Sequence, residues 1–184
     1  MRQAQFFYHN KNAPKPNRPN HIGTSVLIEY RDKLLLEHRT DSETWAIIGG
    51  GLKTEESLAE CAVREVYEET GIKLRENMLE LYGIYDDPSR IASYPDGNVL
   101  RVITVVYKVY LAGGLELVCS AESRELRLFD QEELKQVRIA ETHIPILQDY
   151  LREKEDNNKK ELTEYGYQTG KISMKEQAAG GNRR

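Results

Sequence analysis

The sequence has little cysteine, and its two cysteines form no recognisable framework. Cys61 and Cys119 are the two in 184 residues, whereas zinc sites and disulfide-rich domains need several cysteines at short, regular spacings. Cys61 also has small and apolar neighbours. We therefore expect two free, buried thiols, and free thiols are the usual state in a reducing cytoplasm.

Long apolar runs and an excess of positive charge are also missing. No stretch is long enough to span a membrane, and the first residues lack the pattern of a secretory signal. Lys and Arg total 26 against 30 Asp and Glu, which gives a formal net charge of -4. A broad basic face for duplex nucleic acid is therefore not expected. These absences predict a cytoplasmic protein with no membrane association and no stable nucleic-acid binding.

The length predicts one domain with an appendage at each end. Residues 1–20 include a run rich in Asn, Lys and Pro and are expected to form an arm. Residues 155–184 are polar and lack sustained periodicity, so we expect a tail. The folded domain is expected to span residues 21–154.

Within that domain, apolar segments alternate with turn residues. The predicted strands are Ile22–Tyr30, Lys33–Arg39, Thr44–Ile48, Met78–Asp86, Val99–Ala112 and Glu125–Phe129, with Leu115–Val118 as a further candidate. Two helices are predicted after the last strand, at Gln131–Gln136 and Thr142–Lys154.

The most informative stretch is Gly49–Ile72, which reads GGGLKTEESLAECAVREVYEETGI. Thr54 is predicted to cap a helix that ends before Gly71. One arc of this helix is apolar and is expected to pack on the core. The residues of that arc are Leu58, Ala59, Ala62, Val63 and Val66.

Three glutamates lie beside the apolar arc, at Glu65, Glu68 and Glu69. Their i, i+3 and i+4 spacing places them side by side on one helix face. Carboxylates this close raise each other's pKa unless a positive charge lies among them. Because magnesium prefers oxygen ligands of this kind, the spacing predicts a divalent metal site.

The complete pattern resembles the signature of the Nudix hydrolase family. It consists of Gly50, five residues, Glu56, seven residues, and the run Arg64-Glu65-Val66-Tyr67-Glu68-Glu69-Thr70-Gly71-Ile72. Trp45 and Phe129 also resemble the family, and the resemblance covers about residues 20–152. One departure is Ile48, which stands where the family often has proline.

The resemblance implies an α/β fold, the Nudix α/β/α sandwich with a mixed β-sheet between helices. It implies a metal-dependent hydrolase that cleaves the pyrophosphate linkage of a nucleoside diphosphate joined to another moiety, by water attack on phosphorus. The cofactor is expected to be Mg²⁺, with Mn²⁺ as a substitute, and the partner a small-molecule nucleotide. The alternatives are a nucleotide-binding Nudix-fold sensor without turnover and an RNA 5′-end pyrophosphohydrolase. A homodimer is a further candidate state.

The resemblance also assigns roles to residues of the motif. Glu65 and Glu69 are the implied primary metal ligands. Glu68 is a further ligand or a base that orients water, and the carbonyl of Gly49 joins the ligands. Arg64 orients the glutamates through ion pairs.

Other roles lie around the motif. Glu56 and Gly71 are implied to be structural. Glu122, in the loop before the last strand, is our candidate for an additional general base, with Glu125 as its competitor.

Three further residues are candidates for substrate binding, namely Arg39, Gly50 and Arg90. Tyr94 lies in the same type of loop as Arg90. His38 and His143 are expected to be structural.

Overall fold

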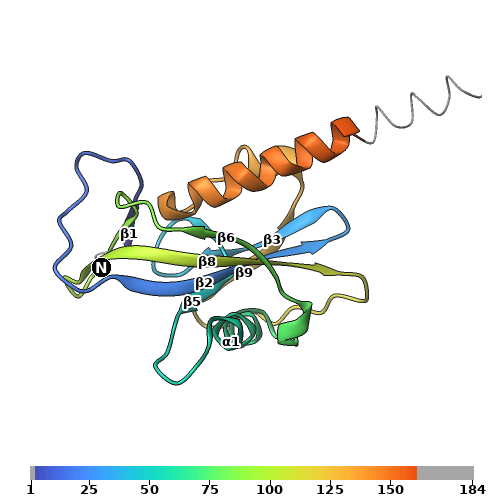
Figure 1. Cartoon of the computed structure of the whole chain (residues 1–184), viewed down its shortest axis with the longest axis horizontal. Helices are drawn as coiled ribbons and strands as arrows, with labels where there is room; N and C mark the ends of the chain where they lie inside the picture. The colour runs from blue at the N-terminus through green and yellow to red at the C-terminus, as the bar shows by residue number, and fades with distance from the viewer. Residues whose placement is uncertain (1–2, 161–184) are drawn as a thin grey trace, which may run out of the picture. The chain divides into compact units, whose positions relative to one another are not determined.

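The computed structural model describes residues 3–160 (Figure 1). The chain divides into two compact units, residues 1–145 and residues 146–184, and each is described by itself. Most of the predicted tail, residues 161–184, lies outside the described residues. In the described part of the chain, no helix has the length and apolar character needed to cross a membrane.

The first unit is built on a mixed β-sheet. Strands β2 and β8 run parallel over the whole length of β2, whereas the other strand pairs are antiparallel. The main strand order is β1-β7-β8-β2-β3-β4, while β5 pairs with β2, β6 with β8 and β9 with β3. The strand bounds are β1 Gln5–Phe7, β2 His21–Tyr30, β3 Lys33–Arg39, β4 Trp45–Ile47, β5 Gly49–Gly51, β6 Glu80–Tyr85, β7 Ile91–Ser93, β8 Val99–Leu111 and β9 Ser123–Phe129.

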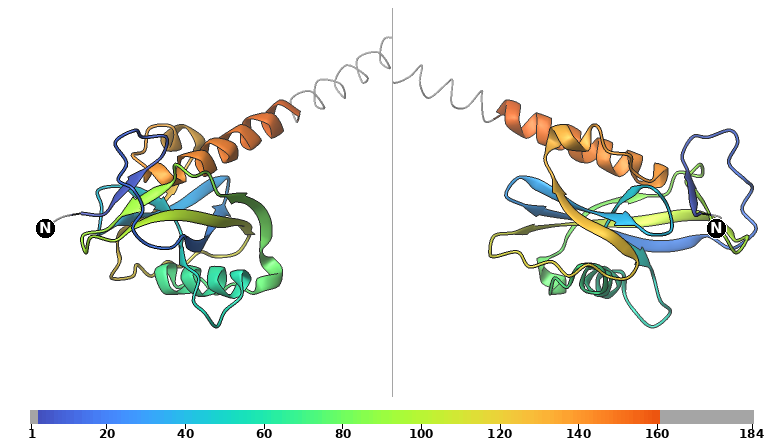
Figure 2. Two further views of the ribbon diagram at one scale, coloured as in Figure 1. Left: turned by 60° about the vertical axis from the view of Figure 1, so that its left-hand side comes forward. Right: turned by 180° about the vertical axis from the view of Figure 1, so that it is seen from behind.

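Helix α1 (Leu58–Thr70) lies against one face of this sheet (Figure 2). The shorter helical segments are α2 (Gln131–Leu134) and the 3-10 turns η1 (Glu76–Met78) and η2 (Glu141–His143). Residues 144–160 are also helical. The predicted α/β class with a mixed sheet is confirmed.

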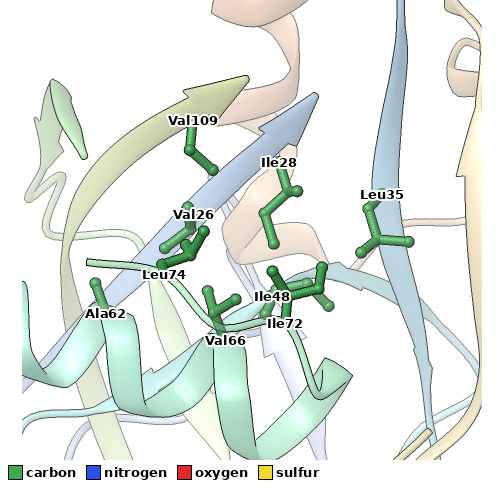
Figure 3. Close-up of a cluster of buried hydrophobic side chains, with 9 residues drawn as sticks. All are labelled: Val26, Ile28, Leu35, Ile48, Ala62, Val66, Ile72, Leu74 and Val109. Atoms are coloured by element: carbon green, nitrogen blue, oxygen red, sulfur yellow. The ribbon is translucent and has the colours of Figure 1, made fainter. Parts of the chain in front are cut away.

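The core between α1 and the sheet is apolar (Figure 3). Its buried members are Val26, Ile28, Leu35, Ile48, Ala62, Val66, Ile72, Leu74 and Val109. Strand β2 contributes alternate residues to this cluster, as expected because strand side chains alternate between the two faces. Packing of Ala62 and Val66 fixes the rotation of α1 about its axis, and with it the position of the glutamates.

The predicted start of α1 is wrong. The N-cap is Ser57 and not Thr54, because Ser57 forms a capping box in which Glu60 N–H donates to its Oγ at 3.2 Å and its own N–H donates to Glu60 Oε2 at 2.7 Å. Glu56 therefore precedes the helix. The predicted end is confirmed, since Gly71 adopts the left-handed conformation with φ 74°.

Two other boundaries also differ from expectation. Leu115–Val118 forms no strand, although Val118 N–H donates to Thr70 O at 2.9 Å. The last described helix continues to residue 160, beyond the predicted end at Lys154. Both cysteines are free, as predicted, and Cys61 is buried, but the expected burial of Cys119 is wrong because this residue is exposed.

His143 connects η2 to β4. Its Nδ1 accepts a hydrogen bond from Ile47 N–H at 3.0 Å, which requires the neutral imidazole. Burial, with smaller effects from Arg90 and Arg39, lowers the pKa of His143 to about 3. The predicted structural role agrees with these contacts.

A stability measurement tests the neutral state of His143. In the unfolded chain its pKa is 6.5, so between pH 6.5 and about 3 the unfolded state binds a proton that the folded state does not. The contribution of neutral His143 to the free energy of unfolding is therefore fully present above pH 6.5. It is lost as the pH falls below 6.5, by at most about 1.4 kcal/mol per pH unit. His143→Gln keeps an acceptor and is expected to flatten this part of the pH profile in urea unfolding. An unchanged slope would contradict the assignment.

Candidate active site

The glycine strand β5 packs so tightly that side chains are excluded from it. A Cβ on Gly49 would lie 2.1 Å from Thr24 O, and the φ of Gly49 is 151°. A Cβ on Gly50 would lie 2.5 Å from the Glu65 carboxylate carbon. The glycines thus bring the backbone of β5 against β2 on one side and against the α1 glutamates on the other.

Arg64 occupies the centre of the glutamate cluster. Its Nε and Nη2 donate to Glu56 at 2.8 and 2.5 Å, and its Nη1 donates to Glu65 at 2.5 Å and Glu68 at 3.0 Å. Nη2 also donates to Gly51 O at 3.1 Å. The hydrogen bonds with Arg64 hold the pKa of Glu56 down at about 2. One guanidinium therefore ties the loop before α1 to two of the helix glutamates.

Glu69 lies deeper than its neighbours. It is 5% exposed, and its Oε2 accepts a hydrogen bond from Gly49 N–H at 3.0 Å. Burial, then the charges of Glu37 and Glu65, raise the pKa of Glu69 to about 9, despite the hydrogen bond from Gly49. Burial also raises the pKa of Glu65. Both carboxyl groups thus lie where water is largely excluded, which disfavours their charged form as long as no cation is bound.

Glu37 of β3 is a site residue that the sequence analysis missed. Its side chain is 1% exposed, accepts from Ser123 Oγ at 2.5 Å and pairs with Arg39 at 3.3 Å. Burial raises the pKa of Glu37, and Arg39 opposes the shift. One available signal was a carboxylate directly after the apolar run Leu34–Leu36 in a predicted strand, since buried acids are rare without a partner.

The predicted metal ligands are not gathered around one point in this structure. Among residues 3–160, no three His, Cys, Asp or Glu side chains are grouped closely enough to hold an ion. Glu65 and Glu68 are instead paired with Arg64, and Glu69 with a backbone N–H. The donor chemistry nevertheless fits a hard divalent cation, because these carboxylates offer oxygen ligands. Glu65 and Glu69, whose pKa values burial raises, would also gain a compensating charge from such a cation.

A cavity of about 90 Å³ lies beside Gly49 and Gly50. Arg39 also lines it, and its Nε and Nη2 hold Asp41 with hydrogen bonds of 2.8 and 2.7 Å. Two of the predicted substrate-binding residues, Arg39 and Gly50, thus border one cavity together with the predicted metal ligand Gly49.

Arg90 does not present its guanidinium to a ligand, and its prediction as a substrate contact is corrected here. The residue is 0% exposed. Its Nε donates to Thr142 O and its Nη2 to Thr104 Oγ1, each at 3.0 Å, and its Nη1 donates to the carbonyl of Tyr85. These partners give it a structural role. A charged residue in a loop was read as exposed because the sequence does not reveal the carbonyls that surround it.

The two candidate bases differ in orientation. Glu122 lies in the turn before β9, where its carbonyl accepts from Thr40 N–H at 2.9 Å, and its charge contributes to raising the pKa of Glu37. Glu125 pairs with His38, whereas Leu126 pairs with Glu37. Since successive strand residues face opposite sides, Glu125 lies on the face away from Glu37. Glu122 is thus the candidate whose charge acts on Glu37, and its role as a general base stays a prediction.

The fold and this cluster define a class of protein: hydrolases of phosphoric anhydrides that carry their acidic residues on a helix behind a glycine loop. Comparison with known proteins gives the family. Residues 19–150 match the NUDIX domain, and the chain belongs to the Nudix hydrolases.

Several known proteins resemble the chain. An "ADP-ribose pyrophosphatase" of Methanocaldococcus jannaschii is 34% identical over 134 residues, which are 71% of this chain and 73% of that protein. A bifunctional NMN adenylyltransferase/ADP ribose pyrophosphatase of Francisella tularensis, complexed with AMP and manganese, has TM-score 0.62 and 24% identity over 76% of this chain and 43% of its own. The NUDIX domain of Shewanella oneidensis NrtR, complexed with ADP ribose, has TM-score 0.60 and 17% identity over 74% of this chain and 89% of its own.

Gly50→Ala tests the close approach of β5 to Glu65. The new Cβ would collide with the Glu65 carboxylate, so we expect Mn²⁺ affinity, measured by calorimetry, to fall about tenfold or more. Gly113→Ala is the matched control, because a Cβ there meets nothing within 4 Å. Equal Mn²⁺ affinity in the two variants, with equal thermal stability, would contradict the prediction that Glu65 is a metal ligand.

Proposed function

We propose that the protein hydrolyses the pyrophosphate linkage of a nucleoside diphosphate joined to another moiety, with Mg²⁺ as cofactor and Mn²⁺ as a substitute. The observation that carries this proposal is the crowding of Glu65 and Glu69 against the glycine strand, beside a cavity. A diphosphate is anionic, and the carboxylates alone would repel it. A cation bound by them reverses the local charge.

Different residues of this chain would bind the cation, orient the carboxylates and accept a proton. The cation would be held by Glu65, Glu68, Glu69 and the Gly49 carbonyl. A bound cation would act as a Lewis acid that polarises phosphoryl oxygens and a water molecule. Arg64 keeps Glu65 and Glu68 on the loop side of α1. Glu122 would accept the proton of the attacking water, a role that Glu68 could take in its place.

The substrate that we favour is ADP-ribose or a similar nucleotide, because a relative at 34% identity is named an ADP-ribose pyrophosphatase. Nucleotide sugars and nucleoside triphosphates are the competing substrates. We place the reaction in the cytoplasm, an assignment supported by the two free cysteines. Homodimerisation stays a prediction, which solution mass measurements would check.

A substrate panel tests the proposed function. The folded protein is incubated with Mg²⁺ and, separately, ADP-ribose, dinucleoside polyphosphates, nucleotide sugars, and normal and oxidised nucleoside triphosphates. Turnover of at least one is expected and stops on chelation. Tight binding of one without turnover would instead support the alternative of a nucleotide sensor.

Glu69→Gln is expected to lower kcat roughly 100-fold or more, because the amide weakens a metal ligand. The fold should persist, since burial already raises the pKa of Glu69 to about 9 and a neutral side chain suits the metal-free site. Turnover and thermal unfolding are measured together, with Glu76→Gln, at an exposed position in η1, as the control. Near-normal turnover in the Glu69 variant would overturn the metal assignment.

Paired variants test the general base. Glu122→Gln is expected to lower kcat about 10²–10⁴-fold with little change in KM, whereas Glu125→Gln should retain wild-type turnover. The pH dependence of kcat should lose its acidic limb in the Glu122 variant alone. If both variants match the wild type, the base lies elsewhere and Glu68 becomes the candidate.

A further inference from the structure

The N-terminal arm is part of the folded unit. Strand β1 pairs antiparallel with β7 through Gln5↔Ser93, Phe6↔Ala92 and Phe7↔Ile91 (Figure 1). Further hydrogen bonds fasten the arm on both sides of β1, from Ala4 N–H to Asp41 O at 2.8 Å and from Tyr8 N–H to Glu141 Oε2 at 3.1 Å. The arm thus docks within its own chain.

Phe6 faces the cavity that borders the glycine strand. It lines that cavity together with Tyr94 and Arg39. The Phe6 and Tyr94 rings meet edge to face, with centroids 6.4 Å apart and planes at 87°, and the Arg39 guanidinium carbon lies 5.7 Å from the Phe6 centroid. One wall of the cavity therefore consists of two aromatic rings and a cation.

This aromatic wall lies in the same cavity as the glycine strand β5, which contacts the proposed metal ligands. Gly49 and Gly50 border the same cavity, and Gly49 N–H donates to the Glu69 carboxylate at 3.0 Å. A diphosphate at the glycine strand would therefore direct one of its attached groups toward Phe6. A nucleobase suits such a wall, because every base has a π-face that stacks on aromatic rings.

The cavity is too small to hold a nucleobase unless one of its lining elements moves. Its volume of about 90 Å³ lies below the roughly 300–1,000 Å³ of typical ligand pockets. Strand β1 is three residues long and pairs with the three-residue strand β7, so few ladder hydrogen bonds oppose its movement. Since β1 pairs with β7 and not with β2, a shift of β1 would leave the β2 ladder intact.

We propose that Phe6, presented by the arm strand β1, is a specificity-determining residue that stacks on the base of the nucleotide substrate, with Tyr94 as its neighbour in the wall. The inference rests on the proposed function and extends it to a residue outside the NUDIX match at residues 19–150. The arm thereby becomes part of the substrate site, and β1 is the segment that shifts to admit the base.

Binding of two probes separates this inference from the proposed function. AMP carries a base, whereas ribose 5-phosphate carries a phosphate and no base. With Mg²⁺ present, Phe6→Ala is expected to weaken AMP binding about 5- to 150-fold, the range for loss of one base–aromatic stack. Binding of ribose 5-phosphate should stay within twofold, and kcat for ADP-ribose should change less than KM.

Matched variants exclude a merely structural effect. Phe7→Ala removes the same ring from the next position of β1, which faces the other side of the strand, and should bind AMP as the wild type does. Phe6→Leu keeps apolar volume without a π-face and should weaken AMP binding as Phe6→Ala does, whereas Phe6→Trp should preserve it. Thermal unfolding of each variant verifies the fold.

The outcomes are distinguishable. Normal AMP binding by Phe6→Ala, in a protein whose wild type hydrolyses ADP-ribose, overturns the role of Phe6 and leaves the proposed function intact. Equal weakening by the Phe6 and Phe7 variants shows a structural effect of the arm and also overturns it. A wild type that neither binds AMP nor hydrolyses any member of the panel overturns both.

Discussion

The candidate site depends on the burial of several carboxylates between helix α1 and the β-sheet. Glu37 approaches from β3, whereas Glu65 and Glu69 approach from α1, and burial raises the pKa of all three. Arg64 compensates one side of the cluster. The proposed divalent cation would compensate the remaining carboxylates, so metal binding and local stability would both depend on the same charges.

Backbone geometry determines how close those charges come. Strand β5 pairs with β2 through Gly23↔Gly51, Thr24↔Gly50 and Ser25↔Gly49, and a Cβ on Gly50 would collide with Glu65. The parallel pair β2 and β8 forms the centre of the sheet, and the apolar contacts of α1 fix the rotation of the helix. The packing of α1 on the core and the close approach of the glycine strand β5 together position the carboxylates.

The sequence predicted those features that depend on local spacing. The helix, its end at Gly71 and the grouping of the α1 glutamates follow from periodicity and capping rules. The cap at Ser57 was missed although Glu60, three residues later, completes a capping box with it. Glu37 and Arg90 were missed or misplaced because their burial depends on strand pairing between distant segments. The position of Phe6 beside the cavity likewise depends on the β1–β7 register, which cannot be read from one sequence.

The most direct test of the central claim is ADP-ribose hydrolysis in ¹⁸O-labelled water with Mg²⁺, with mass spectrometry of the products. Water attack on phosphorus predicts one ¹⁸O atom in the phosphate of AMP or of ribose 5-phosphate, and no products after chelation of the metal. Products without ¹⁸O in either phosphate, or undiminished hydrolysis after chelation, would contradict the account.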